Sequence, residues 1–185
     1  MKVLAFSDLR TTVSLPDVNP DLVILLGHIP SKKVNEIEQK YDCTILGLLS
    51  NSCSPRLYED TTVVNLHRRV VDIEGIRFAG FGGVPLHNND SFGYYSEEEV
   101  ENFVEQLSVS NVDVLISYSN LAYGDIKGAN AKDGFKAYNR IIIEGISKYI
   151  IHGRLYSDFK RKLGETEIFS VYPYKIMTLT NKLEV

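Results

Sequence analysis

Three apolar stretches near the start of this sequence end abruptly in side chains that could bind a metal ion or an anion. The first stops at Ser7 and Asp8, the second stops at Gly27 and His28, and the third is followed closely by Asn51. An imidazole together with a carboxylate or an amide oxygen can ligate a borderline divalent metal ion. The residues that follow each stretch are therefore candidate site residues.

The stretches themselves have the pattern of buried parallel strands, which are near-continuous apolar runs rather than alternating ones. Five such runs are found in the chain, at 3–6, 21–26, 44–49, 112–116 and 149–151. In open α/β sheets, ligands bind at the edge where parallel strands have their carboxyl ends. We therefore expect one edge to gather the side chains that follow the five runs, which are Asp8, His28, Asn51, Tyr118, Arg154 and Tyr156.

Helices and further strands are predicted between and after these runs. Ser31 is expected to cap a helix to residue 40, and Ser96 with Glu99 forms a capping-box pattern for a helix to about residue 107. Glu74 and Gly75 predict the turn of a hairpin. A glycine-containing loop precedes a third helix, and the chain closes with two strands. The predicted helices are 31–40, 96–107 and 137–146, the hairpin is 70–79, and the closing strands are 167–171 and 175–179. The pattern predicts a single α/β domain over residues 1–185, with mixed sheets flanked by helices.

Composition excludes several classes of protein. Among 185 residues, 44% are hydrophobic and 24% are charged, as in soluble globular proteins. The net charge of −4 gives no general case for binding nucleic acid or an anionic membrane, and no apolar run is long enough to span a bilayer. Cys43 and Cys53 lack metal-site spacing, and no signal peptide is apparent, which predicts a cytoplasmic protein with free thiols. Three consecutive cations, Lys160 to Lys162, are expected on a solvated hairpin face.

Taken in order, the residues after the five runs resemble the characteristic blocks of the calcineurin-like metallophosphoesterases. The resemblance extends over nearly the whole chain and rests on Asp8-Leu9-Arg10, Gly27-His28, Ser50-Asn51-Ser52-Cys53, Tyr118 and Gly153-Arg154-Leu155-Tyr156. It implies the layered calcineurin-like phosphoesterase fold. It also implies chemistry in which two divalent cations clamp a phosphate and activate a bridging water.

Most of the family's ligands are replaced here. By position, only Asp8 and Asn51 are retained, and His28 replaces the carboxylate that bridges both metals. Ser52 replaces the histidine that donates a proton to the leaving group. The four histidine ligands are replaced by Arg10, Tyr118, Arg154 and Tyr156.

These replacements predict a site without a bound cofactor. An arginine stays protonated in proteins and cannot ligate a metal, and a neutral tyrosine is a poor ligand. One alternative is a single weakly bound divalent metal at Asp8, His28 and Asn51. A second is a decayed site in which Arg10 or Arg154 forms a salt bridge with Asp8. A third is a metal-free anion pocket, because arginine forks match phosphate oxygens and Asn51, Ser52, Tyr118 and Tyr156 could add hydrogen bonds.

The predicted function is accordingly a binding or scaffold module that has a phosphoesterase fold without catalysis. The alternative is a metal-dependent phosphoesterase, hydrolysing a phosphomonoester or phosphodiester with residual activity from a reduced site. A structural protein in which only oligomerisation matters is a further alternative. The expected partner is another protein or a phosphorylated small molecule, and a homo-oligomer stays open.

Overall fold

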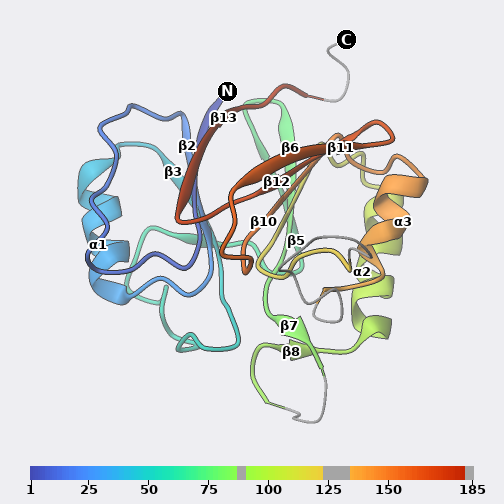
Figure 1. The fold of residues 1–185 in the computed structure, drawn as a ribbon, viewed down its shortest axis with the longest axis horizontal. Helices are drawn as coiled ribbons and strands as arrows, with labels where there is room; N and C mark the ends of the chain where they lie inside the picture. The colour runs from blue at the N-terminus through green and yellow to red at the C-terminus, as the bar shows by residue number, and fades with distance from the viewer. Residues whose placement is uncertain (87–90, 123–133, 182–185) are drawn as a thin grey trace.

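The computed structural model describes residues 1–86, 91–122 and 134–181. Two larger β-sheets pack face to face at the centre, with α1 on one side and α2 and α3 on the other (Figure 1). The described part of the chain contains no helix long and apolar enough to cross a membrane. The predicted long loop with Gly124 and Gly128 lies outside the described residues.

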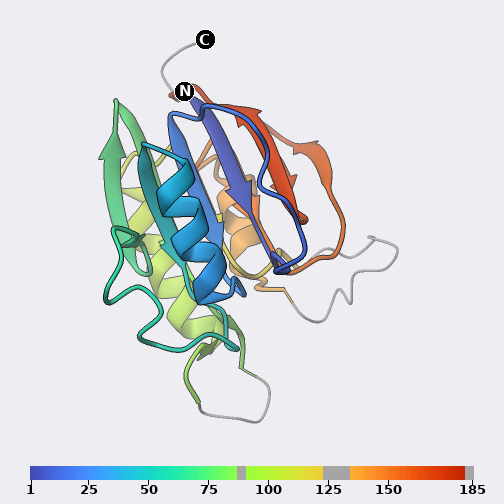
Figure 2. The same ribbon diagram turned by 90° about the vertical axis from the view of Figure 1, so that its left-hand side faces the viewer.

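The first sheet is formed mainly by the N-terminal part of the chain. Its strand order is β13 (Tyr174–Thr178), β1 (Lys2–Phe6), β2 (Leu22–Leu26), β3 (Thr44–Leu48) and β4 (Val64–Asn65). Strands β1 to β4 are parallel, and β13 runs antiparallel to β1. Helix α1 (Ser31–Lys40) covers the outer face, as Figure 2 shows, and buries Val34 and Ile37.

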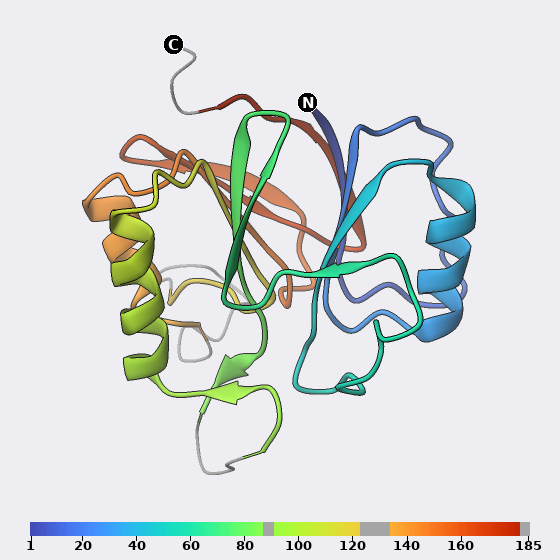
Figure 3. The same ribbon diagram turned by 180° about the vertical axis from the view of Figure 1, so that it is seen from behind.

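The second sheet carries the two other helices. Its order is β11 (Phe159–Leu163), β12 (Thr166–Ser170), β10 (Tyr149–His152), β9 (Val114–Ser117), β6 (Ile76–Phe81) and β5 (Arg69–Ile73). The four inner strands are parallel, whereas β5 and β11 are antiparallel to their neighbours. Helices α2 (Glu97–Ser108) and α3 (Tyr138–Ile143) cover its outer face (Figure 3). A short parallel pair, β7 (Val84–Pro85) and β8 (Tyr94–Tyr95), lies beside them.

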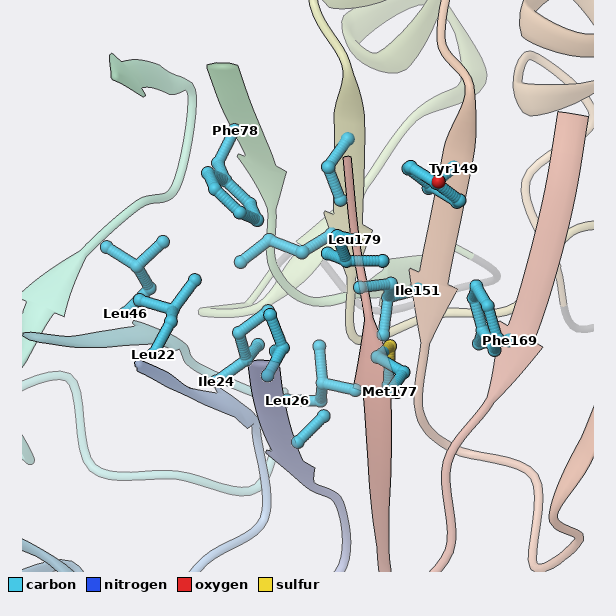
Figure 4. Packing of buried hydrophobic residues seen from close by; sticks show 14 of the residues in the cluster. Leu22, Ile24, Leu26, Leu46, Phe78, Tyr149, Ile151, Phe169, Met177 and Leu179 are labelled. Atoms are coloured by element: carbon cyan, nitrogen blue, oxygen red, sulfur yellow. The ribbon is translucent and has the colours of Figure 1, made fainter. Parts of the chain in front are cut away.

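The core between the sheets explains why the central strands are almost wholly apolar. Leu22, Ile24 and Leu26 of the first sheet pack against a layer from the second that includes Phe78 and Ile151 (Figure 4). The alternate residues of the same strands contact the helices instead, so both faces are buried. Burying one such side chain stabilises the fold by about 1.5–3 kcal/mol. The result is a rigid frame that holds the loops at the carboxyl ends of the strands.

The helices and the hairpin agree with the predictions in most details. The capping box of α2 is confirmed: Glu99 donates its backbone N–H to Ser96 Oγ at 3.2 Å, and Ser96 donates its own N–H to Glu99 at 2.9 Å. The hairpin turn is confirmed, with φ of 52° at Glu74 and 80° at Gly75, as a tight turn between antiparallel strands requires.

Two helix ends differ from the predictions. Helix α1 starts where expected, but its N-cap is Pro30, with no side-chain cap among the described residues, so the prediction that Ser31 caps it is wrong. Helix α3 is shorter than the predicted 137–146, because the chain turns at Gly145, where φ is 59°.

Candidate functional site

The carboxyl ends of strands from both sheets meet at one edge. Arg154, after β10, donates its backbone N–H to the side-chain oxygen of Ser7, after β1, at 3.4 Å. Gly153 donates its N–H to the carbonyl of Ser117, at the end of β9, at 3.2 Å. A Cβ on Gly153 would lie 2.2 Å from Ser7 Oγ, so only glycine fits here without movement. The two sheets therefore meet where the backbone of Gly153 and Arg154 contacts the side chain of Ser7, at the place where the sequence predicts the site.

Three residues at this edge have left-handed backbone conformations. The φ angles are 49° at Asp8, 50° at His28 and 65° at Arg154, and each residue is the second after its strand. The N–H of Leu155 binds the carbonyl of Gly153 at 2.8 Å, which closes a tight turn around Arg154. Such φ values are uncommon outside glycine, and backbone strain of this kind clusters at functional sites.

The carboxyl group of Asp8 is held inside a cluster of hydrogen bonds. Only 6% of Asp8 is exposed, and Ser7 Oγ donates to its carboxyl at 2.9 Å. The Tyr118 hydroxyl and the backbone N–H of Arg154 lie close enough to favour the charged form of this carboxyl. Burial nevertheless raises the pKa of Asp8 above its usual value, against these interactions and the nearby charge of His28. We call Ser7, Asp8, Tyr118 and Arg154 the inner cluster.

Neither Arg10 nor Arg154 has the arrangement expected of a salt bridge with Asp8 in the described part of the chain. Among the residues that the structure describes, no ion pair joins Asp8 to Arg10 or Arg154. The guanidinium of Arg154 instead donates to Ser119 Oγ at 3.4 Å. The amide of Asn51 is also engaged, since it donates to the hydroxyl of Tyr94 at 2.9 Å.

In front of the inner cluster lies a cavity of about 970 Å³, which we call the outer cavity. It is lined by the loops that follow β1, β2 and β3, together with Tyr156. Five of the eight predicted site residues lie on its wall: Asp8, Arg10, His28, Ser52 and Tyr156. The other three, which also belong to the described chain, are outside this lining: Asn51, Tyr118 and Arg154.

Several wall residues were missed by the sequence predictions. Arg56 is exposed and makes a 3.7 Å surface ion pair with Glu59, while hydroxyl groups come from Thr11, Thr12, Ser31 and Ser54. Cys53 accepts backbone N–H groups from His28 at 3.3 Å and Ser50 at 3.4 Å, which ties the two loops together. These residues lie in the segments that follow β1, β2 and β3, five to eight residues past the strand ends, so extending the search along each whole segment would have found them.

The wall of the outer cavity favours an anion. Arg10 and Arg56 bring two positive charges, whereas the carboxyl contributed by Asp8 is buried behind them and has a raised pKa. Helix α1 begins at the cavity with Pro30 and Ser31 and has no acidic residue in its first turn. The positive end of its dipole therefore adds to the field of the arginines.

The residues present do not fit the two-metal centre that the fold family implies. Within the described chain, no three His, Cys, Asp or Glu side chains are placed together so that they could hold a metal ion. Asp8 and His28 are close enough for their charges to interact, but Asn51 is bonded to Tyr94. A fixed guanidinium at Arg10 also opposes a nearby cation.

Comparisons with known proteins bear on the fold. No protein-family model matches this sequence, and no curated protein matches it either. Among solved structures, TT1561 of Thermus thermophilus superimposes with a TM-score of 0.64 at 13% identity, covering 91% of this chain and 88% of that one. A single-residue variant of Vps29 from Entamoeba histolytica has a TM-score of 0.43 at 12% identity, covering 92% of this chain and 73% of that one. TT1561 has the calcineurin-like phosphoesterase fold. With its layered mixed sheets and flanking helices, the present chain has the calcineurin-like phosphoesterase fold as well.

Proposed function

We propose that this protein is a non-catalytic binding module that holds a phosphate-like anion in the outer cavity without a metal ion. The observation that carries the proposal is the position of Arg10. It lines a large cavity at the carboxyl ends of β1 to β3, where the fold family would place metal ligands. A guanidinium there supplies permanent positive charge together with forked N–H donors that match phosphate oxygens.

The remaining wall supports the same ligand class. Arg56 adds a second fork, and Ser52 and Ser54 add hydroxyl donors from the loop after β3. Asp8 acts in this proposal as a structural group, because its buried carboxyl accepts a hydrogen bond from Ser7 Oγ, which itself accepts the backbone N–H of Arg154. The anion then binds in front of Asp8 rather than to it.

Residue chemistry argues against turnover at this site. Hydrolysis of a phosphoester needs an activated nucleophile and a proton donor for the leaving group. Ser52 occupies the position of the family's proton donor, and a serine hydroxyl is a poor acid. The guanidinium of Arg10 can neither accept a proton nor ligate a metal. The module therefore releases its phosphorylated ligand unchanged.

Melting curves with and without inorganic phosphate test the proposal. Phosphate at about 100 times its dissociation constant should stabilise the fold by about 2.7 kcal/mol. Arg10→Met should abolish that shift while keeping most of the stem packing. The matched control is Arg69→Met, an exposed arginine on β5 outside the cavity, which should retain the full shift. A parent protein that phosphate does not stabilise would refute phosphate binding.

The proximity of Asp8 and His28 supports a second candidate, a residual phosphoesterase with one weakly bound divalent metal. Both side chains line the outer cavity, and their charges interact. Manganese-dependent hydrolysis of p-nitrophenyl phosphate, lost in both Asp8→Asn and His28→Gln, would favour this candidate. Background hydrolysis with and without manganese favours the binding module.

A further inference from the structure

The outer cavity is much larger than an inorganic anion requires. Its volume of about 970 Å³ lies at the upper end of the range for sites that enclose whole organic ligands, roughly 300–1,000 Å³. A phosphate ion held by Arg10 or Arg56 would leave most of this space unused. The cavity therefore fits a phosphorylated molecule whose further parts contact the rest of the wall.

One end of the cavity offers an aromatic ring. Tyr156 is 70% exposed although it lines the cavity, and its ring meets Tyr172 edge-on, with centroids 5.2 Å apart and an interplanar angle of 86°. That contact steadies the phenol ring while most of its surface stays open. The tight turn at Arg154 directs the chain to this place. An exposed, steadied tyrosine is a platform on which a planar ring can stack.

Tyr156 and one of the two arginines, Arg56, lie on different sides of the cavity, whereas Arg10 follows β1 on the tyrosine side. Tyr172 precedes Pro173, whose carbonyl accepts the N–H of Ser7, so Tyr156 and Tyr172 belong to the β13–β1 side. Arg56 comes from the loop after β3. Strands β1 and β3 are separated by β2, which places these loop origins roughly 10 Å apart at the usual strand spacing. A ligand that contacts both sides needs a spacer between its ring and its phosphate.

Both sides of the cavity also carry hydroxyl groups. Thr11 and Thr12 after β1 and Ser52 after β3 line the cavity, and these groups pair with the hydroxyls of a sugar rather than with a hydrocarbon spacer. We infer that the ligand is a nucleoside monophosphate, with its base on Tyr156, its ribose along the hydroxyl groups and its phosphate at Arg56. This inference rests on the proposed function, because the phosphate end is the anion site already described.

Calorimetric titration of the full chain with adenosine 5′-monophosphate, ribose 5-phosphate and inorganic phosphate tests the inference. The nucleotide should bind at least about 5-fold more tightly than ribose 5-phosphate, because stacking of one base is worth about 1–3 kcal/mol. Tyr156→Ala should remove that advantage, and Tyr156→Phe should keep it because the ring remains. Phe92→Ala, which removes an exposed aromatic residue outside the cavity, serves as the control and should change nothing.

The possible outcomes distinguish the stacking site from the anion pocket. If the nucleotide binds no more tightly than ribose 5-phosphate, the stacking site is refuted while the anion pocket stands. If phenyl phosphate binds as tightly as the nucleotide, the sugar is not recognised and the assignment to a nucleoside is refuted. If none of these phosphates binds, the anion pocket itself is refuted.

Discussion

The inner cluster and the outer cavity arise from the same strand ends and yet have opposite properties. In the inner cluster, Asp8 is 6% exposed and is held by Ser7, Tyr118 and the backbone of Arg154. In the outer cavity, Arg10, His28 and Tyr156 are exposed. The comparison teaches that the residues at these strand ends are divided, with one part absorbed into the packing and the other left on the wall of an open cavity. Substitutions in the first part should change stability, and substitutions in the second should change binding.

The largest expected effect concerns His152, which ends β10 directly behind the inner cluster. Complete burial lowers the pKa of His152 to about 4, from an ordinary value of 6.5. A lowered pKa in the folded state means that its contribution to stability is present above pH 6.5 and is lost as the pH falls through about 4. The loss should be on the order of 3 kcal/mol.

The measurement is the free energy of unfolding at pH 7 and at pH 4 for the parent and for His152→Gln. The parent should lose more stability than the variant across this interval. Ser52→Ala, in the outer cavity, provides the contrast and should keep the parent's pH dependence, because it removes no ionisable group. A parent and a His152→Gln variant with the same pH dependence would contradict the assignment.

The second effect concerns Gly153, where the two sheets touch. In Gly153→Ala the new methyl group meets Ser7 Oγ, and the overpacking should lower the free energy of unfolding by about 2–3 kcal/mol. Gly145→Ala is the matched control: its Cβ meets nothing within 4 Å, so only its positive φ is penalised, by about 1 kcal/mol. Urea denaturation compares the two. Equal losses would show that the contact between the strand ends is loose.

The smallest of these effects concerns Asp8 and should be stabilising. Because burial raises the pKa of Asp8 in the folded state, its contribution to stability is present below the unfolded value of 3.8 and is lost as the pH rises through the folded pKa. Asp8→Asn removes that loss and should raise the free energy of unfolding at pH 7, on the order of 1 kcal/mol. The gain should vanish below pH 3.8.

Thermal melts of Asp8→Asn across this pH range test the expectation, with the exposed Asp17→Asn as a control that should change little. Destabilisation by Asp8→Asn at pH 7 would mean that the hydrogen bonds of the carboxylate outweigh the effect of its burial. The inner cluster would then be a source of stability rather than a strained remnant.

Local residue patterns accounted for the strands and the site edge. The parallel strands are buried on both faces, so their sequences are unbroken apolar runs that can be read directly. The polar residues that end them, such as Asp8 and His28, mark the carboxyl ends. Helix α2 was equally predictable, because its capping box is a local hydrogen-bond pattern between Ser96 and Glu99. The start of α1 was less so, since Pro30 takes a position that Ser31 was expected to fill.

What local patterns could not determine was which strand-end residues face the ligand. Arg10 and Arg154 both follow strand ends, yet Arg10 lines the outer cavity while Arg154 donates to Ser119. The difference depends on the left-handed turn at Arg154 and on the close contact of Gly153 with Ser7. The sequence alone thus determined the fold class and the edge that carries the site, because both follow from the burial of short segments. Only the tertiary structure decided the division between inner cluster and outer cavity, because that division depends on how loops from two sheets pack against each other.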